Sequence, residues 1–181
     1  LPALYDLAAQ NLLPSPMHVV GVARRHCTVE DLLTRIEKAV KEKGDKCDQT
    51  VLKHLGEQIE IFTMDLGKTE DYIKLRHRLD AIEDEANMCM NRLFYMAIPA
   101  QLFDDVIQCA AEGGLNHSCP HATGKSRLLI EKPFGYDLDS AKKLIHLLRK
   151  HFKEDQLYRI DHYLAKETAQ NILTFRFQNA L

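Results

Sequence analysis

Residues 158–167 read YRIDHYLAKE and place an acid, an imidazole, a phenol and a lysine close together, as Asp161, His162, Tyr163 and Lys166. The lysine, histidine and tyrosine can together hold a phosphate dianion, and a helix N-terminus adds further donors. His162 and Lys166 are four residues apart and would share one helical face. Asp161 would repel a dianion, so its carboxylate is better suited to orient a general-base histidine. The alternative is a capped helix start with the other side chains in solvent.

Lys132 is a second candidate, because it follows an apolar run and opens the turn KPFG (132–135). Pro133 restricts the chain where it leaves the predicted strand. A lysine at the mouth of a strand is a compact cation that can donate to a sugar hydroxyl or a carbonyl. The alternative is an ordinary surface lysine.

Arg24 and Arg25 follow the apolar run HVVGVA. In an NAD-binding doubly wound fold, the second strand usually ends in an acid that bonds the ribose 2′-hydroxyl. A carboxylate would repel a 2′-phosphate, whereas a guanidinium donates to it. If this run is the second strand of such a fold, NADP is favoured over NAD; otherwise the two arginines are surface residues. The glycine-rich phosphate loop that should precede this strand is absent, and Leu1 is not a methionine, so we expect that an N-terminal segment is missing.

The elements that must position these side chains alternate between strand and helix, without hairpins. This pattern predicts an α/β protein with a Rossmann-like, doubly wound parallel sheet and helices on both faces, which binds ligands at the carboxyl ends of its strands. Thr28 and Asp137 are expected to cap two of the helices. We predict strands over residues 18–23, 59–64, 92–98, 127–132 and 157–160, and helices before Pro14, after Thr28, over 69–86, after Pro99, after Asp137 and over 164–178.

Two helical stripes are expected to face the core. The first lies after Thr28 and the second after Asp137. Their members are Leu32, Leu33, Ile36 and Val40 in the first, and Leu138, Ala141, Ile145, Leu148 and Phe152 in the second.

The composition argues against several other classes of protein. No apolar run approaches the roughly 20 residues of a membrane helix, and a formal charge of −2 without a basic block gives no reason to expect a nucleic-acid partner. The five scattered cysteines predict free thiols. His117, Cys119 and His121 in HSCPH lack a second ligand pair, so we expect a solvated loop and no metal site.

Four segments together resemble a known family. VVGVARR (19–25), RLFYMAIP (92–99), IEKPFG (130–135) and RIDHYLAKE (159–167) occur in an order and at intervals similar to those of the N-terminal coenzyme domain of glucose-6-phosphate dehydrogenase. The resemblance covers essentially the whole chain. It implies an enzyme of the cytoplasmic oxidative pentose phosphate pathway that oxidises glucose 6-phosphate at C1 to the 6-phospho-lactone, passing hydride to NADP.

The resemblance also implies a role for each matching residue. Lys132 would contact both substrate and coenzyme, and Asp161 would pair with the general-base histidine. The substrate 6-phosphate would be held by His162, Tyr163 and Lys166. The coenzyme would be bound by Arg24 and Arg25 at the 2′-phosphate, by Asp65 and Leu66 at the adenosine half, and by Pro99 near the nicotinamide.

The resemblance further implies that the chain is truncated at both ends. Residues 1–160 would form the coenzyme domain without its first strand, and 161–181 would carry the phosphate motif and begin the connection to a C-terminal α+β domain. The general-base histidine would lie beyond Leu181, so we expect the fragment alone to be inactive. The family usually self-associates, so we expect a homo-oligomer of the full-length protein. Three alternatives remain: another two-domain sugar oxidoreductase with a Glu-Lys-Pro motif, a non-catalytic binding module of the same fold, and the endoplasmic-reticulum hexose-6-phosphate relative.

Overall fold

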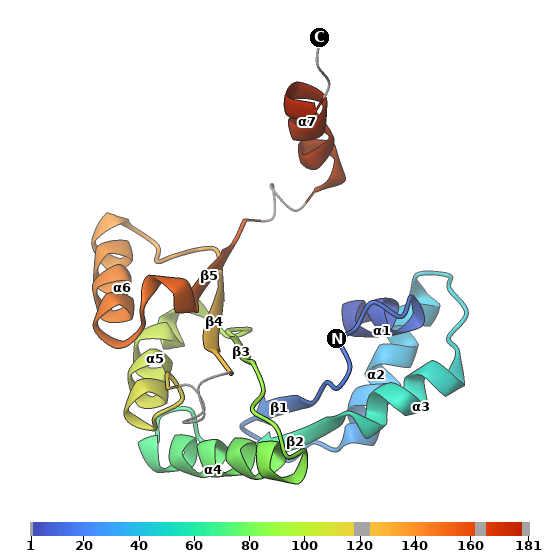
Figure 1. Cartoon of the computed structure of the whole chain (residues 1–181), viewed down its shortest axis with the longest axis horizontal. Helices are drawn as coiled ribbons and strands as arrows, with labels where there is room; N and C mark the ends of the chain where they lie inside the picture. The colour runs from blue at the N-terminus through green and yellow to red at the C-terminus, as the bar shows by residue number, and fades with distance from the viewer. Residues whose placement is uncertain (1, 118–123, 162–165, 179–181) are drawn as a thin grey trace. The chain divides into compact units, whose positions relative to one another are not determined.

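The structure is a computed structural model in which residues 2–117, 124–161 and 166–178 are described (Figure 1). The chain forms two compact units, Leu1–Asp65 and Leu66–Leu181. Each unit contains a small parallel sheet with helices. The predicted α/β class with parallel strands is therefore confirmed.

The first unit holds two parallel strands and three helices. The strands β1 (Val19–Ala23) and β2 (Ile59–Thr63) pair in parallel along their whole length. The helices are α1 (Pro2–Ala9), α2 (Val29–Glu42) and α3 (Gln49–Glu57). Buried residues of all three helices and of β2 form one core cluster: Tyr5, Ile36, Val40, Leu52, Leu55 and Ile59.

The start of α2 confirms the predicted helix cap. The Asp31 amide donates to the Thr28 hydroxyl, and the Thr28 amide donates to the Asp31 carboxylate, both at 3.1 Å. The bond from the Thr28 amide to the carboxylate is the main reason why the pKa of Asp31 is lowered. Helix α3 was not predicted, although Asp48 marks its start by accepting from the Thr50 amide at 2.8 Å.

The second unit holds three parallel strands in the order β3, β4, β5. They are β3 (Arg92–Tyr95), β4 (Ser126–Glu131) and β5 (Leu157–Ile160). The described helices of this unit include two short 3₁₀ turns. The helices are α4 (Thr69–Glu85), η1 (Ala100–Leu102), α5 (Phe103–Glu112), α6 (Leu138–His151), η2 (Glu154–Gln156) and α7 (Glu167–Gln178).

The strand order within each sheet follows the order of the chain. One sheet is β1–β2 and the other is β3–β4–β5, and every neighbouring pair is parallel. Parallel strands whose connections contain helices are typical of α/β proteins with doubly wound sheets.

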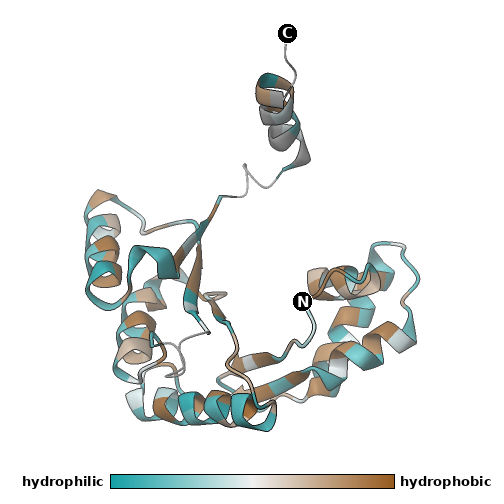
Figure 2. Ribbon diagram, in the orientation of Figure 1, coloured by the Kyte–Doolittle hydropathy of each residue, from teal (hydrophilic) through white to brown (hydrophobic). Residues whose placement is uncertain are grey.

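The core stripe predicted for α6 is only partly right. Leu148 and Phe152 are buried, but Leu138 is 68% exposed and Ile145 is 40% exposed. Leu144 is buried instead, because packing against α5 selects the face carrying Leu144 and Leu148. Hydrophobic and hydrophilic residues alternate around this helix (Figure 2), so its sequence allows more than one apolar stripe. The stripe predicted for α2 is confirmed at Ile36 and Val40, with Leu32 and Leu33 partly buried beside the core.

Two further observations concern the membrane helices and the cysteines discussed from the sequence. Within the described residues, no helix is both long and apolar enough to cross a membrane. The thiols of Cys27, Cys47 and Cys109 are free, as predicted. Cys89 is disulfide-bonded, so the prediction of a free thiol is wrong at that position.

Candidate functional site

Lys132 and Asp161 meet at the carboxyl edge of the three-stranded sheet. Strands β4 and β5 are parallel, and their last pair is Glu131 with Ile160. Lys132 and Asp161, the residues that follow this pair, therefore lie next to each other at the end of the sheet. The Lys132 Nζ lies 2.6 Å from the Asp161 Oδ2. Both side chains reach solvent, at 48% and 32% exposure, so the pair is accessible to a ligand.

The turn after Lys132 is held by the start of α6. Lys132–Pro133 is a cis peptide bond, and Gly135 has a φ of 90°. A Cβ at Gly135 would lie 2.7 Å from the Ala141 nitrogen, so only glycine fits. Asp137 caps α6 as predicted, accepting from the Ser140 amide at 2.7 Å, and its bonds to Ser140 lower the pKa of Asp137.

The neighbouring strand β3 is tied to the same edge. The Tyr95 hydroxyl donates a short hydrogen bond to the carboxylate of Glu131, the residue before Lys132. This bond, assisted by partial burial, raises the pKa of Tyr95. Pro99, the predicted nicotinamide neighbour, is exposed and precedes the turn η1. The Tyr95–Glu131 bond is a feature that the sequence reasoning missed, because neither residue type nor spacing singled it out.

The phosphate motif is only partly within the described residues. His162 and Tyr163 lie outside them. Lys166 is exposed. Helix α7 begins at Glu167, so Lys166 lies just before the helix and not in its first turn, as we had expected. The alternative interpretation, in which Asp161 caps a helix start, depends on residues 162–165, which lie outside the described residues.

The first unit brings its predicted coenzyme residues to the carboxyl edge of its own sheet. Arg24 and Arg25 directly follow the last residue of β1, and both are exposed. The ladder between β1 and β2 continues for one more bond, from the Met64 amide to the Ala23 carbonyl at 3.0 Å. Asp65 comes next and is exposed. Arg24, Arg25 and Asp65 therefore follow adjacent strand ends.

Leu66 begins the second unit and is held by a buried tyrosine. The Tyr72 hydroxyl donates to the Leu66 carbonyl at 2.8 Å, and Tyr72 is only 3% exposed. The bond fixes the segment between β2 and α4. The single aromatic residue of the stretch TEDYIKL was the signal in the sequence that could have identified this contact.

The loop with HSCPH contributes little to the described site. His117 is exposed, and Cys119 and His121 lie outside the described residues. Within the ranges that are described, no three metal-binding side chains form a cluster.

The end of β1 presents two cationic side chains to solvent. The guanidinium groups of Arg24 and Arg25 are exposed and form no ion pair with any described residue. Free guanidinium groups at the end of a parallel strand are suited to a phosphate monoester.

Comparison with known proteins agrees with this geometry. Residues 1–171 match the family model described as glucose-6-phosphate dehydrogenase, NAD binding domain. A glucose-6-phosphate 1-dehydrogenase of Aggregatibacter actinomycetemcomitans is 37% identical, over 99% of this chain and 35% of that protein. A chloroplastic glucose-6-phosphate 1-dehydrogenase of Spinacia oleracea is 34% identical, over 98% of this chain and 30% of that protein.

A solved structure shows the same fold. It is a glucose-6-phosphate dehydrogenase in complex with its substrate glucose-6-phosphate, 32% identical, with a TM-score of 0.84 over 98% of this chain and 36% of that one. The chain thus spans about a third of the length of the relatives it matches. The match to the family model over nearly the whole chain places this protein in the glucose-6-phosphate dehydrogenase family, in the part that forms the NAD-binding domain.

Proposed function

We propose that the protein acts, as a full-length chain, as an NADP-dependent glucose-6-phosphate 1-dehydrogenase. It would oxidise glucose 6-phosphate at C1 to the 6-phospho-lactone. Family membership supports this proposal, and one structural observation supports it most directly: the contact between Lys132 and Asp161 at the end of two parallel strands. Because the chain matches only about a third of its relatives' length, the reaction requires residues that they carry elsewhere.

Lys132 has the donors that such a reaction needs. An ammonium group carries three N–H donors. One of them is directed to Asp161 at 2.6 Å, and no other described residue forms an ion pair with it. Two donors can therefore serve the substrate and the coenzyme. The positive charge also stabilises negative charge that develops on the substrate oxygen as its proton leaves.

Asp161 would orient a general-base histidine from outside this chain. We expected this carboxylate to be set apart from the cations, whereas it is paired with Lys132. A carboxylate has two oxygens and about four acceptor positions. Asp161 can therefore hold Lys132 and still accept from an imidazole N–H. The two roles are compatible, and the pairing fixes the carboxylate where the histidine would need it.

The family match supports the assignment of coenzyme contacts to individual residues. We assign Arg24 and Arg25 to the 2′-phosphate, Asp65 and Leu66 to the adenosine half, and Pro99 and Lys132 to the nicotinamide half. When bound, NADP supplies the acceptor for the hydride from C1. The unpaired guanidinium groups favour NADP over NAD, because only NADP carries the 2′-phosphate.

The 6-phosphate would be held by His162, Tyr163 and Lys166, and Lys166 is exposed. The division into a coenzyme domain over 1–160 and a connecting segment over 161–181 remains part of this proposal. So do a homo-oligomeric state of the full-length enzyme, the oxidative pentose phosphate pathway and a cytoplasmic location. At least one similar relative is named as chloroplastic, so location varies among relatives.

The proposal is tested by assaying the full-length protein with each combination of two substrates and two coenzymes. We expect fast reduction of NADP with glucose 6-phosphate and little with glucose, because only the former fills the phosphate site. Equal rates with both sugars would favour another two-domain sugar oxidoreductase. Failure to bind NADP or glucose 6-phosphate at all would favour a non-catalytic module.

A further inference from the structure

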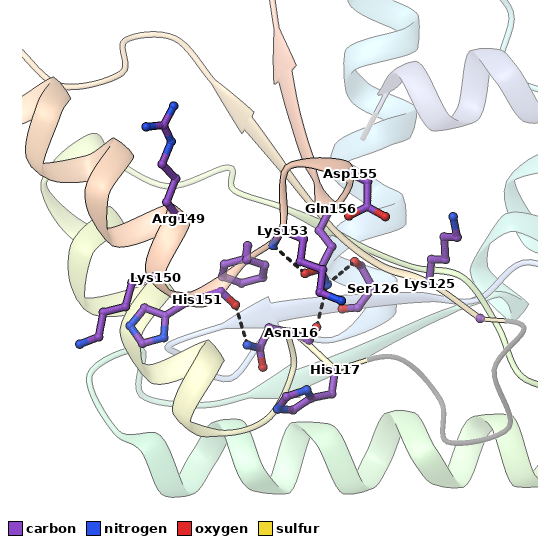
Figure 3. A pocket seen from close by; sticks show the side chains of 12 residues that line it. Asn116, His117, Lys125, Ser126, Arg149, Lys150, His151, Lys153, Asp155 and Gln156 are labelled. Carbon is purple, nitrogen blue, oxygen red and sulfur yellow. Dashed lines mark hydrogen bonds between the residues drawn. The ribbon is translucent and has the colours of Figure 1, made fainter.

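The second unit contains a cavity of about 520 Å³ at the edge of its sheet opposite Lys132. Ser126, the first residue of β4, lies in its wall, whereas Lys132 follows the last residue of that strand. A six-residue strand is about 20 Å long. The cavity is therefore separate from the candidate active site described above. Its other walls come from the end of α6 and from η2 (Figure 3).

The lining of this cavity is strongly basic. Four cationic side chains line it but only one carboxylate, that of Asp155. The four cations are Lys125, Arg149, Lys150 and Lys153, and His117 and His151 add two imidazoles. This concentration of positive charge is unusual in a chain whose formal net charge is −2.

Part of this charge has an ordinary structural explanation. Arg149, Lys150 and His151 form the last turn of α6, where cations offset the negative end of the helix dipole. Figure 3 shows Arg149 and Lys150 extending outward from the helix end. The helix does not account for Lys125, which precedes β4, or for Lys153, which precedes η2.

Lys125 and Lys153 also lack the partners that neutralise other lysines. Lys74 and Lys143 each lie 2.7 Å from a carboxylate oxygen. No described residue forms an ion pair with Lys125 or Lys153. Two lysines from different segments thus contribute unneutralised charge to one cavity, and an anion bound there would reduce their mutual repulsion.

The wall between these lysines is held firmly in place. The Gln156 side-chain amide donates to the Asn116 carbonyl at 2.7 Å and to the Ser126 carbonyl at 3.0 Å. Its oxygen accepts from the Lys153 amide at 2.9 Å. Asn116 in turn donates to the His151 carbonyl at 2.7 Å. One glutamine therefore links the segment after α5, the start of β4 and the turn that carries Lys153.

We propose that this cavity binds a small, multiply charged phosphate compound, with Lys125 and Lys153 as its principal ligands. The volume is in the range of small-molecule sites. Lysine binds phosphate as a compact point charge. The bound anion would be a diphosphate or a phosphate ester. The described residues that line the cavity include none of those assigned to either phosphate in the proposed function.

The test is a titration of the full chain with inorganic pyrophosphate, at constant ionic strength, followed by ¹⁵N–¹H NMR. Shifts are expected at the Gln156 side-chain amide and at the backbone amides of Lys153 and Ser126. Lys125→Gln together with Lys153→Gln should weaken this binding about tenfold or more, because two charge-assisted contacts are lost. The matched control, Lys46→Gln with Lys53→Gln, makes the same change of charge in the first unit and should alter binding less than about twofold.

Two results would overturn the proposal: no localised shift at these three amides, or equal weakening by the control pair. Pyrophosphate could also occupy the proposed substrate-phosphate site, and shifts near Asp161 and Lys166 would report that event separately. The cavity proposal can therefore be wrong while the proposed dehydrogenase function is right, and it can be right while that function is wrong.

Discussion

The ammonium of Lys132 lies 2.6 Å from the carboxylate of Asp161, although 29 residues separate them in the sequence. The contact exists because β4 and β5 are parallel and in register, so that the residues immediately after Glu131 and Ile160 emerge side by side. Each strand is followed by a polar residue at the position where a doubly wound sheet binds its ligands. The two residues form the centre of the candidate site.

Replacing Lys132 by alanine in the full-length protein should lower kcat/KM for glucose 6-phosphate about a hundredfold to a thousandfold. The reason is the loss of a charged donor that stabilises the transition state. Steady-state kinetics with NADP measure this effect. Lys142→Ala removes an exposed lysine from α6 and serves as the control, with unchanged kinetics expected. Normal activity of the Lys132 variant would remove this lysine from the mechanism.

Replacing Asp161 by asparagine should move the acidic limb of the kcat/KM profile to lower pH. A neighbouring carboxylate stabilises an imidazolium and raises the pKa of the general-base histidine, and asparagine does not. The same change should lower kcat, because the histidine loses its orientation. Rates measured across a range of pH values check both effects. A raised KM with an unchanged pH profile would show that Asp161 acts only by holding Lys132.

Replacing Arg24 by alanine should weaken binding of NADP about tenfold to a hundredfold, as expected for the loss of one charged hydrogen bond of about 1.5–3 kcal/mol. Binding of NAD should change little, because NAD has no 2′-phosphate. Titration of the full-length protein with each coenzyme gives the comparison. Arg35→Ala, on the exposed face of α2, is the matched control. An equal loss for both coenzymes would contradict the assignment.

Replacing Gly135 by alanine should lower the free energy of unfolding by about 1–3 kcal/mol, since φ is positive and the new Cβ would meet the Ala141 nitrogen. Gly44 is a matched control, because its φ is 87° and nothing lies within 4 Å of a Cβ built there. Gly44→Ala should therefore cost less, about 1 kcal/mol. Urea denaturation measures both. Equal costs would show that the clash at Gly135 is relieved.

Replacing Arg92 by leucine should destabilise the second unit by about 3–5 kcal/mol, because it leaves a buried carboxylate unpaired. The Arg92 Nε donates to Glu83 at 2.9 Å, and both side chains are only 9% exposed. Adding Glu83→Gln removes the isolated charge and should recover part of the loss. Urea denaturation of the single and double variants decides the matter, and no recovery in the double variant would rule out an electrostatic origin.

The five strands were predictable because each is a short apolar run of the type that a buried parallel strand requires. The caps were predictable too, since Thr28 and Asp137 bond to amides only three residues away. Helix α3 was missed because it is only nine residues long, so its apolar stripe repeats over few turns. The buried face of α6 was predicted wrongly because this helix carries two apolar stripes. Packing against α5, which is distant in the sequence, decides which of the two stripes is buried.

By itself, the sequence determined the strands and most of the helices, the residue types at the strand ends and, through four motifs, the family. These depend on contacts within a few residues or on patterns that resemble those of relatives. Only the tertiary structure decided that Lys132 pairs with Asp161, that Tyr95 holds Glu131, and that Tyr72 holds Leu66. The first two contacts depend on strand register and the third on the path of the chain between β2 and α4. Neither the register nor this path is determined by the residue types that make the contacts.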